Sequence, residues 1–312
     1  MPHSSLKNWI PYQFDKQLCY WLNTHTEPFT EPFFDDTINK CKKMGNRYFT
    51  PVSRIEMLKE WADDLDYIAP TAFIFHVSRC GSTLVSQLLA TARENMVLSE
   101  VPFFDDLLRL PFQGTGFNQN EVSSLLDAAI RIYGQKRTGH EQHLFIKTDS
   151  WHIFFYEQLR SLYPDVPFIL MYRNPDEVLA SHLKIPGMQA VPGLIEPALF
   201  GFEPDDITYN RPDIYTSRVL EKYLERYHHI INTDSNCLLL NYNEGPMAMI
   251  NKIAAFTNTP ISDGDLAAMN QRSQYHSKRP GEAFQEETQP QKPLYINKAM
   301  ELYDELEYLV LK

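Results

Sequence analysis

The sequence lacks the features that mark a secreted, membrane-spanning or metal-binding protein. Its 312 residues include only four cysteines, which are scattered, show no metal-ligand spacing and suit a reducing cytoplasm. No apolar stretch is long enough to cross a bilayer, and the first residues have no apolar segment behind a basic tip. The net charge of −11 argues against non-specific binding to nucleic acid or an anionic membrane. We therefore expect a cytoplasmic protein without a metal site.

From residue 71 onward, short apolar runs alternate with helical patterns. The runs cover 72–77, 96–99, 143–148, 166–172 and 236–242; the main helical patterns cover 83–93, 121–135, 151–163, 175–184, 213–233, 246–257 and 296–311. This alternation predicts an α/β domain over 71–312, with a central, mostly parallel sheet flanked by helices. Residues 1–70 are rich in aromatics and proline, and we expect a mainly helical N-terminal extension packed on that core.

One stretch, IFHVSRCGSTLVSQLLA at 74–90, predicts a strand joined to a helix by a polar turn. The turn consists of Ser78, Arg79, Cys80, Gly81, Ser82 and Thr83. Such a turn points backbone N–H groups at a phosphate-like anion above the helix N-terminus. A nucleotide kinase has a lysine before its Ser-Thr pair, where this chain has Gly81. At the predicted helix start, Cys80 can have a lowered thiol pKa, whereas His76 is interpreted as a residue of the core or pocket wall.

Polar residues follow every predicted strand, where ligands bind in parallel sheets. They are Ser78-Arg79, Ser99-Glu100, Lys147-Thr148-Asp149, Arg173 and Tyr242-Asn243-Glu244. Ser181 lies eight residues after Arg173, so two turns of helix can place both on a second anion, with the charge-assisted bonds that an arginine fork provides. We therefore predict one shared pocket that binds two anionic groups.

The combination of a phosphate-binding loop and a separate Arg/Ser pair resembles the donor site of the sulfotransferases that use 3′-phosphoadenosine 5′-phosphosulfate (PAPS). Ser78–Thr83 looks like their 5′-phosphosulfate loop, and Arg173 and Ser181 match their 3′-phosphate pair in type and spacing. Glu100 matches the catalytic glutamate of the tyrosylprotein and Golgi-type enzymes, and Lys147 matches a lysine of the same enzymes. Tyr242 lies in a segment similar to a late motif of the fold, and the late basic loop would contain Ser277, Lys278 and Arg279.

The resemblance implies sulfuryl transfer from PAPS to a hydroxyl of a small-molecule acceptor, leaving adenosine 3′,5′-bisphosphate (PAP). Arg79 and Lys147 would stabilise developing charge, and Glu100 would accept the acceptor proton. The cytosolic enzymes use a Lys-Thr-His sequence, but this chain has Lys147-Thr148-Asp149, so Asp149 is a rival base. The short dimer motif of those enzymes is absent, so the oligomeric state stays open.

Two other functions stay open: a P-loop kinase or nucleotide hydrolase, and an inactive PAPS-binding protein. A magnesium-dependent nucleoside-triphosphate activity would indicate the first, whereas the presence of Glu100 and Lys147 argues against the second. Residues 185–212 contain five prolines, three glycines and many apolar side chains. A connection of that length favours a lid over the acceptor, with a surface loop packed by its own side chains as the alternative.

Overall fold

The centre of the computed structural model, which describes residues 6–15, 17–45, 49–275 and 296–310, is a five-stranded parallel sheet. Its order is β5-β6-β4-β7-β8. The strands are β4 (Pro70–His76), β5 (Asn95–Ser99), β6 (His143–Lys147), β7 (Phe168–Tyr172) and β8 (Cys237–Asn241). Each corresponds to one of the predicted apolar runs, so the expected α/β architecture is confirmed. All five residues of β7 are buried because helices cover both faces of the sheet.

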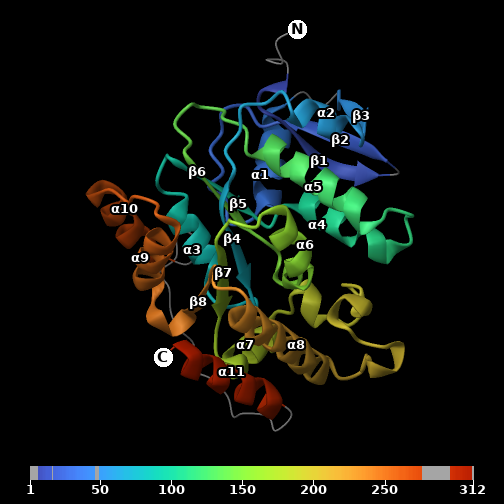
Figure 1. Cartoon of the computed structure of the whole chain (residues 1–312), viewed down its shortest axis with the longest axis vertical. Coiled ribbons are helices and arrows are strands. Elements are labelled where there is room, and N and C mark those ends of the chain that lie inside the picture. The colour runs from blue at the N-terminus through green and yellow to red at the C-terminus, as the bar shows by residue number, and fades with distance from the viewer. Residues whose placement is uncertain (1–5, 16, 46–48, 276–295, 311–312) are drawn as a thin grey trace.

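The helices form two layers around this sheet (Figure 1). They are α3 (Ser82–Leu89), α4 (Pro102–Arg109), α5 (Gln119–Tyr133), α6 (Tyr156–Leu162), α7 (Pro175–Lys184), α8 (Pro212–Thr233), α9 (Pro246–Thr257), α10 (Asp263–Ser273) and α11 (Asn297–Val310). Figure 1 shows α3, α9 and α10 on one side of the sheet, and α5, α6 and α8 on the other. Each strand-helix-strand unit therefore returns to the same edge, and all five strands end on the same side of the molecule.

The N-terminal region differs from the expected helical extension. It contains a three-stranded antiparallel sheet of β1 (Trp9–Asp15), β2 (Leu18–Asn23) and β3 (Val52–Arg54), with α1 (Phe34–Met44) and α2 (Met57–Ala62). The prediction was wrong because the aromatic residues of β1 and β2 favour strands when they pack on a half-buried surface. That surface includes α5, where the Tyr133 hydroxyl donates to the Pro11 carbonyl.

The 185–212 segment contains three short 3₁₀ turns, at Met188–Ala190, Pro197–Phe200 and Pro204–Asp206, and is otherwise irregular up to the start of α8. Its Leu199, Phe200 and Phe202 side chains are buried, so part of the segment packs against the body of the protein. Among the helices of the described residues, none combines the length and the apolar character that a bilayer span requires.

Candidate active site

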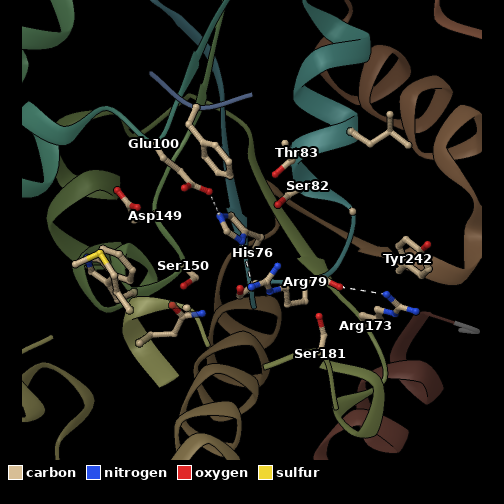
Figure 2. A pocket seen from close by; sticks show the side chains of 18 of the residues that line it. His76, Arg79, Ser82, Thr83, Glu100, Asp149, Ser150, Arg173, Ser181 and Tyr242 are labelled. Atoms are coloured by element: carbon tan, nitrogen blue, oxygen red, sulfur yellow. Dashed lines mark hydrogen bonds and ion pairs between the residues drawn. The ribbon is translucent and has the colours of Figure 1, made fainter. Parts of the chain in front are cut away.

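A pocket of about 1060 Å³ lies at the carboxyl ends of the sheet and contains most of the polar residues singled out in the sequence. In Figure 2, Arg173, Ser181 and Tyr242 lie on one side, and Glu100, Asp149 and Ser150 lie on the other. His76 and Arg79 lie between the two groups. The pocket therefore has a half that suits a nucleotide phosphate and a half rich in carboxylates.

The loop after β4 adopts an unusual backbone conformation at the half of the pocket that contains Arg173 and Ser181. The φ angles of Ser78, Arg79 and Gly81 are 69°, 52° and 79°, in the left-handed region that costs residues other than glycine about 1–3 kcal/mol. Gly81 has a second constraint, since a Cβ atom there would lie 2.8 Å from Cδ2 of Tyr242. Ser82 and Thr83 begin α3 directly after this turn and line the pocket. The local strain, together with the helix N-terminus, is typical of an anion-binding turn.

Cys80 is the one loop residue whose side chain turns away from the pocket. It is fully buried, and its thiol approaches the Met171 carbonyl at 3.5 Å. Burial raises the pKa of Cys80 to about 11, so the lowered pKa expected from its position at the helix start is wrong. The thiol therefore packs against β7 as a small apolar group.

Arg173 and Ser181 lie in the same half of the pocket, from the end of β7 and from α7. The Arg173 guanidinium lies 4.0 Å from the centroid of the Tyr242 ring, and its Nε donates to the Glu177 carboxylate. Its Nη1 also donates to the Arg79 carbonyl at 3.4 Å, which ties the arginine to the loop. The ring and the carboxylate fix the guanidinium plane, as bidentate recognition of an anion requires.

Glu100 follows β5 and has a φ angle of 54°, another left-handed conformation. Its N–H donates to the Lys147 carbonyl at 2.8 Å, and its carboxylate forms an ion pair with the Lys147 ammonium. Burial acts to raise the pKa of Glu100, but the Lys147 charge and a hydrogen bond from His76 outweigh burial and lower it. Glu100 is therefore ionised at neutral pH and faces the pocket.

Lys147 does not reach the pocket that contains the other predicted site residues. Its side chain is fully buried beneath Glu100 at the end of β6 and is absent from the pocket lining. The expected direct contact between this lysine and a sulfuryl group is not available in this geometry. Lys147 instead holds the Glu100 carboxylate.

The sequence predicts that His76 is a residue of the core or pocket wall. In the structure, both ring nitrogens of His76 also make polar contacts that the sequence did not reveal. Its Nε2 lies 3.0 Å from the Thr148 carbonyl and 3.3 Å from Glu100 Oε1, and its Nδ1 accepts the Ser78 N–H at 3.1 Å. Burial and the Lys147 charge lower the pKa of His76, so the ring is neutral at neutral pH. Only its position next to the loop hinted at these contacts.

Asp149 lines the carboxylate half, 3.8 Å from the His152 ring. Burial, followed by the charges of Glu100 and Asp105, raises the pKa of Asp149 well above its usual value. The raised pKa favours the protonated form of this rival base, whereas the lowered pKa of Glu100 favours the carboxylate.

Asp105 and Arg109 were missed because α4, which carries them, was not predicted. Asp105 accepts from Trp151 Nε1 at 2.6 Å and from Arg109 Nη1 at 2.9 Å, and it lies 3.0 Å from His152 Nε2. Potential ligand atoms of Asp105, Asp149 and His152 lie within 4.8 Å of one another, which is close enough for a divalent cation. Spacing in the sequence gave no hint of this group, because its members come from α4 and from the 3₁₀ turn at Ser150–Phe155 with its N-cap Asp149, which follows β6. The Asp105 oxygens are already engaged by three side chains, which compete with a metal.

The N-terminal region and the 185–212 segment also contribute to the pocket wall. Phe33 and Asp35 come from the first, and Gly187, Met188 and Gln189 from the second. Arg79 Nη2 donates to the Ile185 carbonyl at 2.8 Å. Arg109 holds Glu196 through two bonds, from Nε at 2.7 Å and Nη2 at 2.9 Å. The segment is therefore attached to both halves of the pocket.

Asp106 adds another acidic group to the half that holds Asp35, Asp105 and Asp149. Burial, with the nearby charge of Asp105, raises the pKa of Asp106 to about 6. Neither Asp35 nor Asp106 has an ion-pair partner among the described residues. This half of the pocket therefore has a negative potential at neutral pH. The three residues of the expected late basic loop, Ser277, Lys278 and Arg279, lie outside the described residues.

Comparison with solved structures identifies the fold. The sulfotransferase domain of the curacin biosynthetic pathway matches with a TM-score of 0.52 and 14% identity, over 78% of this chain and 99% of that domain. Sulfotransferase STF9 from Mycobacterium avium matches with a TM-score of 0.51 and 12% identity, over 83% of this chain and 81% of that one. The sulfotransferase domain of the Synechococcus PCC 7002 olefin synthase matches with a TM-score of 0.50 and 16% identity, over 78% and 97%. No protein-family model and no curated protein matches the sequence. The chain therefore has the fold of the sulfotransferases.

Proposed function

We propose that this protein is a PAPS-dependent sulfotransferase that acts on the hydroxyl of a small molecule. The observation that carries the proposal is the position of the strained Ser78–Thr83 loop between the Arg173/Ser181 pair and the ionised Glu100 in one pocket. Two anion sites on one side of a candidate base are what a bisphosphorylated donor and a hydroxyl acceptor need. The sulfotransferase fold supports the same assignment.

In this proposal the loop N–H groups and Arg79 bind the 5′-phosphosulfate, and Arg173 and Ser181 bind the 3′-phosphate. Tyr242 stacks on Arg173 and lies against Gly81, so it keeps the two anion sites in register. Ser82 and Thr83 add hydroxyls at the start of α3. Positioning of this kind supplies most of the catalysis in phosphoryl transfer, which sulfuryl transfer resembles.

The chemical step is an in-line displacement at sulfur. The acceptor oxygen forms a bond to sulfur while the bond from sulfur to the 5′-phosphate oxygen breaks, and PAP leaves with that electron pair. Glu100 accepts the hydroxyl proton as the new bond forms and later releases it to solvent. Arg79, between the two halves, stabilises charge on the sulfuryl oxygens, and Lys147 keeps Glu100 oriented from below the pocket floor.

The acceptor binds in the carboxylate half, against walls that include Phe33 and Trp151. The N-terminal 70 residues, which we treat as an extension of a catalytic part over 71–312, thus help to shape the acceptor site. The 185–212 segment acts as a lid over it. The negative potential of Asp35, Asp106 and neighbouring carboxylates opposes anionic acceptors, so we propose an uncharged or cationic alcohol or phenol.

A kinase or nucleotide hydrolase is the second candidate, because a strand-loop-helix turn also binds nucleoside triphosphates. The position of the kinase lysine is held by Gly81, which packs against Tyr242 and has no room for a side chain. A catalytically inactive PAPS-binding protein is the third. The ionised state and strained backbone of Glu100 favour a catalyst over an inactive binding protein.

Differential scanning fluorimetry with three nucleotides separates these functions. We expect PAP to raise the melting temperature, and 5′-AMP or ATP with magnesium to have little effect, since they lack the 3′-phosphate. Incubation with sulfur-labelled PAPS and a cell extract should then give a labelled product. Stabilisation by ATP with magnesium alone would indicate a kinase, and stabilisation by PAP without any labelled product would indicate a binding protein.

A further inference from the structure

We propose that His76 is a positioning residue that couples the donor loop to the base, with one ring nitrogen assigned to each. The inference rests on the proposed sulfotransferase function. The Nδ1 atom fixes the loop through Ser78, and the Nε2–H fixes Glu100 and the end of β6. Figure 2 shows the ring between these two elements, with a dashed contact to Glu100.

The hydrogen bonds define the tautomer. The backbone N–H of Ser78 can only donate, so Nδ1 of His76, 3.1 Å away, must carry the lone pair. The proton of the neutral ring is then on Nε2, where the Thr148 carbonyl at 3.0 Å and Glu100 Oε1 at 3.3 Å are both acceptors. Each polar atom of this buried ring thus has a partner of the right kind, and the partners follow three different strands, β4, β5 and β6.

The contact at Nδ1 explains how the strained loop is held. Ser78 and Arg79 are consecutive residues in the left-handed conformation, which persists only where the surroundings enforce it. The Ser78 N–H points back to His76, so this donor is withdrawn from the anion site and used to fix the turn. The N–H groups that follow are then available for the donor phosphosulfate.

The contact at Nε2 explains how Glu100 keeps its orientation when the acceptor arrives. Lys147 holds the carboxylate from below, and the His76 N–H approaches Oε1 from the donor side. Two fixed neighbours leave the other carboxylate oxygen as the natural proton acceptor. A ring that served packing alone would not need both nitrogens bonded to elements that carry the reacting groups.

Two conservative variants can separate the two contacts. The amide of asparagine reaches the Nδ1 position, so His76→Asn keeps an acceptor for Ser78 and loses the donor to Glu100. The amide of glutamine reaches the Nε2 position, so His76→Gln keeps the donor and loses the acceptor. His228→Asn is the matched control, since His228 Nε2 contacts the Leu302 carbonyl at 2.8 Å between α8 and α11, away from the pocket.

The binding of PAP to each variant is then measured by calorimetry. Turnover is measured with saturating sulfur-labelled PAPS and a fixed amount of the cell extract that supplies the acceptor. We expect His76→Asn to lower kcat about 10- to 100-fold with the PAP dissociation constant within threefold, a loss below that of removing a general base. We expect His76→Gln to weaken PAP binding about tenfold, the size of one net hydrogen bond, with kcat within fivefold. His228→Asn should lower the melting temperature without changing either constant. Equal changes in both constants for the two His76 variants, or no change, would overturn the coupling.

Nitrogen-15 NMR of the histidine rings gives a test that needs no activity. The proposal requires a neutral His76 ring with the proton on Nε2 at pH 7, in the free protein and with PAP bound. A proton on Nδ1 would overturn the inference while leaving the sulfotransferase assignment intact. Absence of both PAP binding and PAPS turnover in the unaltered protein would instead remove the proposed function, and this inference with it.

Discussion

Lys147 and Glu100 form an ion pair in which only the acidic partner reaches the pocket. Lys147 is fully buried at the end of β6, and the Glu100 carboxylate lies above it on the wall. A buried lysine keeps the carboxylate ionised, since neutralising one partner would leave the other charge unpaired. The pair therefore gives this site an ionised carboxylate of fixed orientation, and the proposed role as general base rests on that positioning and not on a raised pKa.

The first prediction concerns the base. We expect Glu100→Gln to lower turnover about 10²- to 10⁴-fold, because a positioned general base contributes about that factor. Donor binding should stay within a few-fold, because the loop and Arg173 are unchanged. Asp149→Asn should lower turnover much less, since the raised pKa of Asp149 favours the protonated form, which cannot accept a proton. Steady-state kinetics and calorimetry check both; loss of turnover in Asp149→Asn with an active Glu100→Gln would make Asp149 the base.

The second prediction concerns pH and stability. The pKa of Asp149 is raised in the folded protein, so the folded state holds a proton that the unfolded chain releases above about pH 4. The stabilisation that Asp149 gains from binding this proton is fully present below that pH, and it is lost as the pH rises through the pKa of the folded state. Asp149→Asn removes this loss. At pH 7–8 the variant should therefore have a higher melting temperature than the unaltered protein, and the difference should disappear toward pH 4. A lower melting temperature across this range would show that the carboxyl is ionised.

The third prediction concerns the 3′-phosphate. Arg173→Ala should weaken PAP binding by about 2 kcal/mol or more, the scale of a hydrogen bond to a charged group. Arg173→Lys should retain only part of the affinity for PAP, since a lysine lacks the guanidinium fork that the Tyr242 ring orients. Binding of 5′-AMP, which has no 3′-phosphate, is the control and should be unaffected. An equal loss for both nucleotides would place Arg173 elsewhere on the donor.

The fourth prediction concerns Gly81. The backbone of Gly81 has a φ angle of 79°, and a Cβ atom added at this position would lie 2.8 Å from the Tyr242 ring. We expect Gly81→Ala to weaken PAP binding more than tenfold, because the Tyr242 ring must move away from Arg173. Gly114→Ala is a matched control with a φ angle of 66° and no atom within 4 Å. It should cost about 1–2 kcal/mol of stability through the left-handed backbone alone, with normal PAP binding. If both variants bind PAP normally, the contact with Tyr242 does not matter.

The fifth prediction concerns the 185–212 segment. If it covers the acceptor, its amide hydrogen exchange should slow when PAP and acceptor are bound together. Arg109→Ala removes both bonds to Glu196 and should abolish the slowing and raise the acceptor KM. Arg109→Lys keeps the charge but not the paired geometry, and should be intermediate. Exchange that is the same with and without ligands would make the segment a packed surface loop.

The order of the core elements was encoded locally. Apolar runs of strand length separated by helical patterns predicted the five parallel strands, because a strand covered on both faces must be apolar along its whole length. The rule that ligands bind at strand ends then singled out Glu100, Asp149 and Arg173 before any geometry was known. These residues needed no tertiary information, since their place in the chain already assigned them to one edge of the sheet.

The remaining features depend on contacts between segments far apart in the chain. The β1–β3 sheet forms because its aromatic residues find a surface on α5, which the local pattern does not show. Burial reversed the expected pKa shift of Cys80 and raised the pKa of Asp149, since desolvation depends on what surrounds a group and not on its neighbours in sequence. The sequence by itself was enough to assign Glu100, Asp149 and Arg173 to the strand ends that line the pocket. Only the tertiary structure decided their charge states and partners, because these follow from distances and solvent exclusion that folding creates.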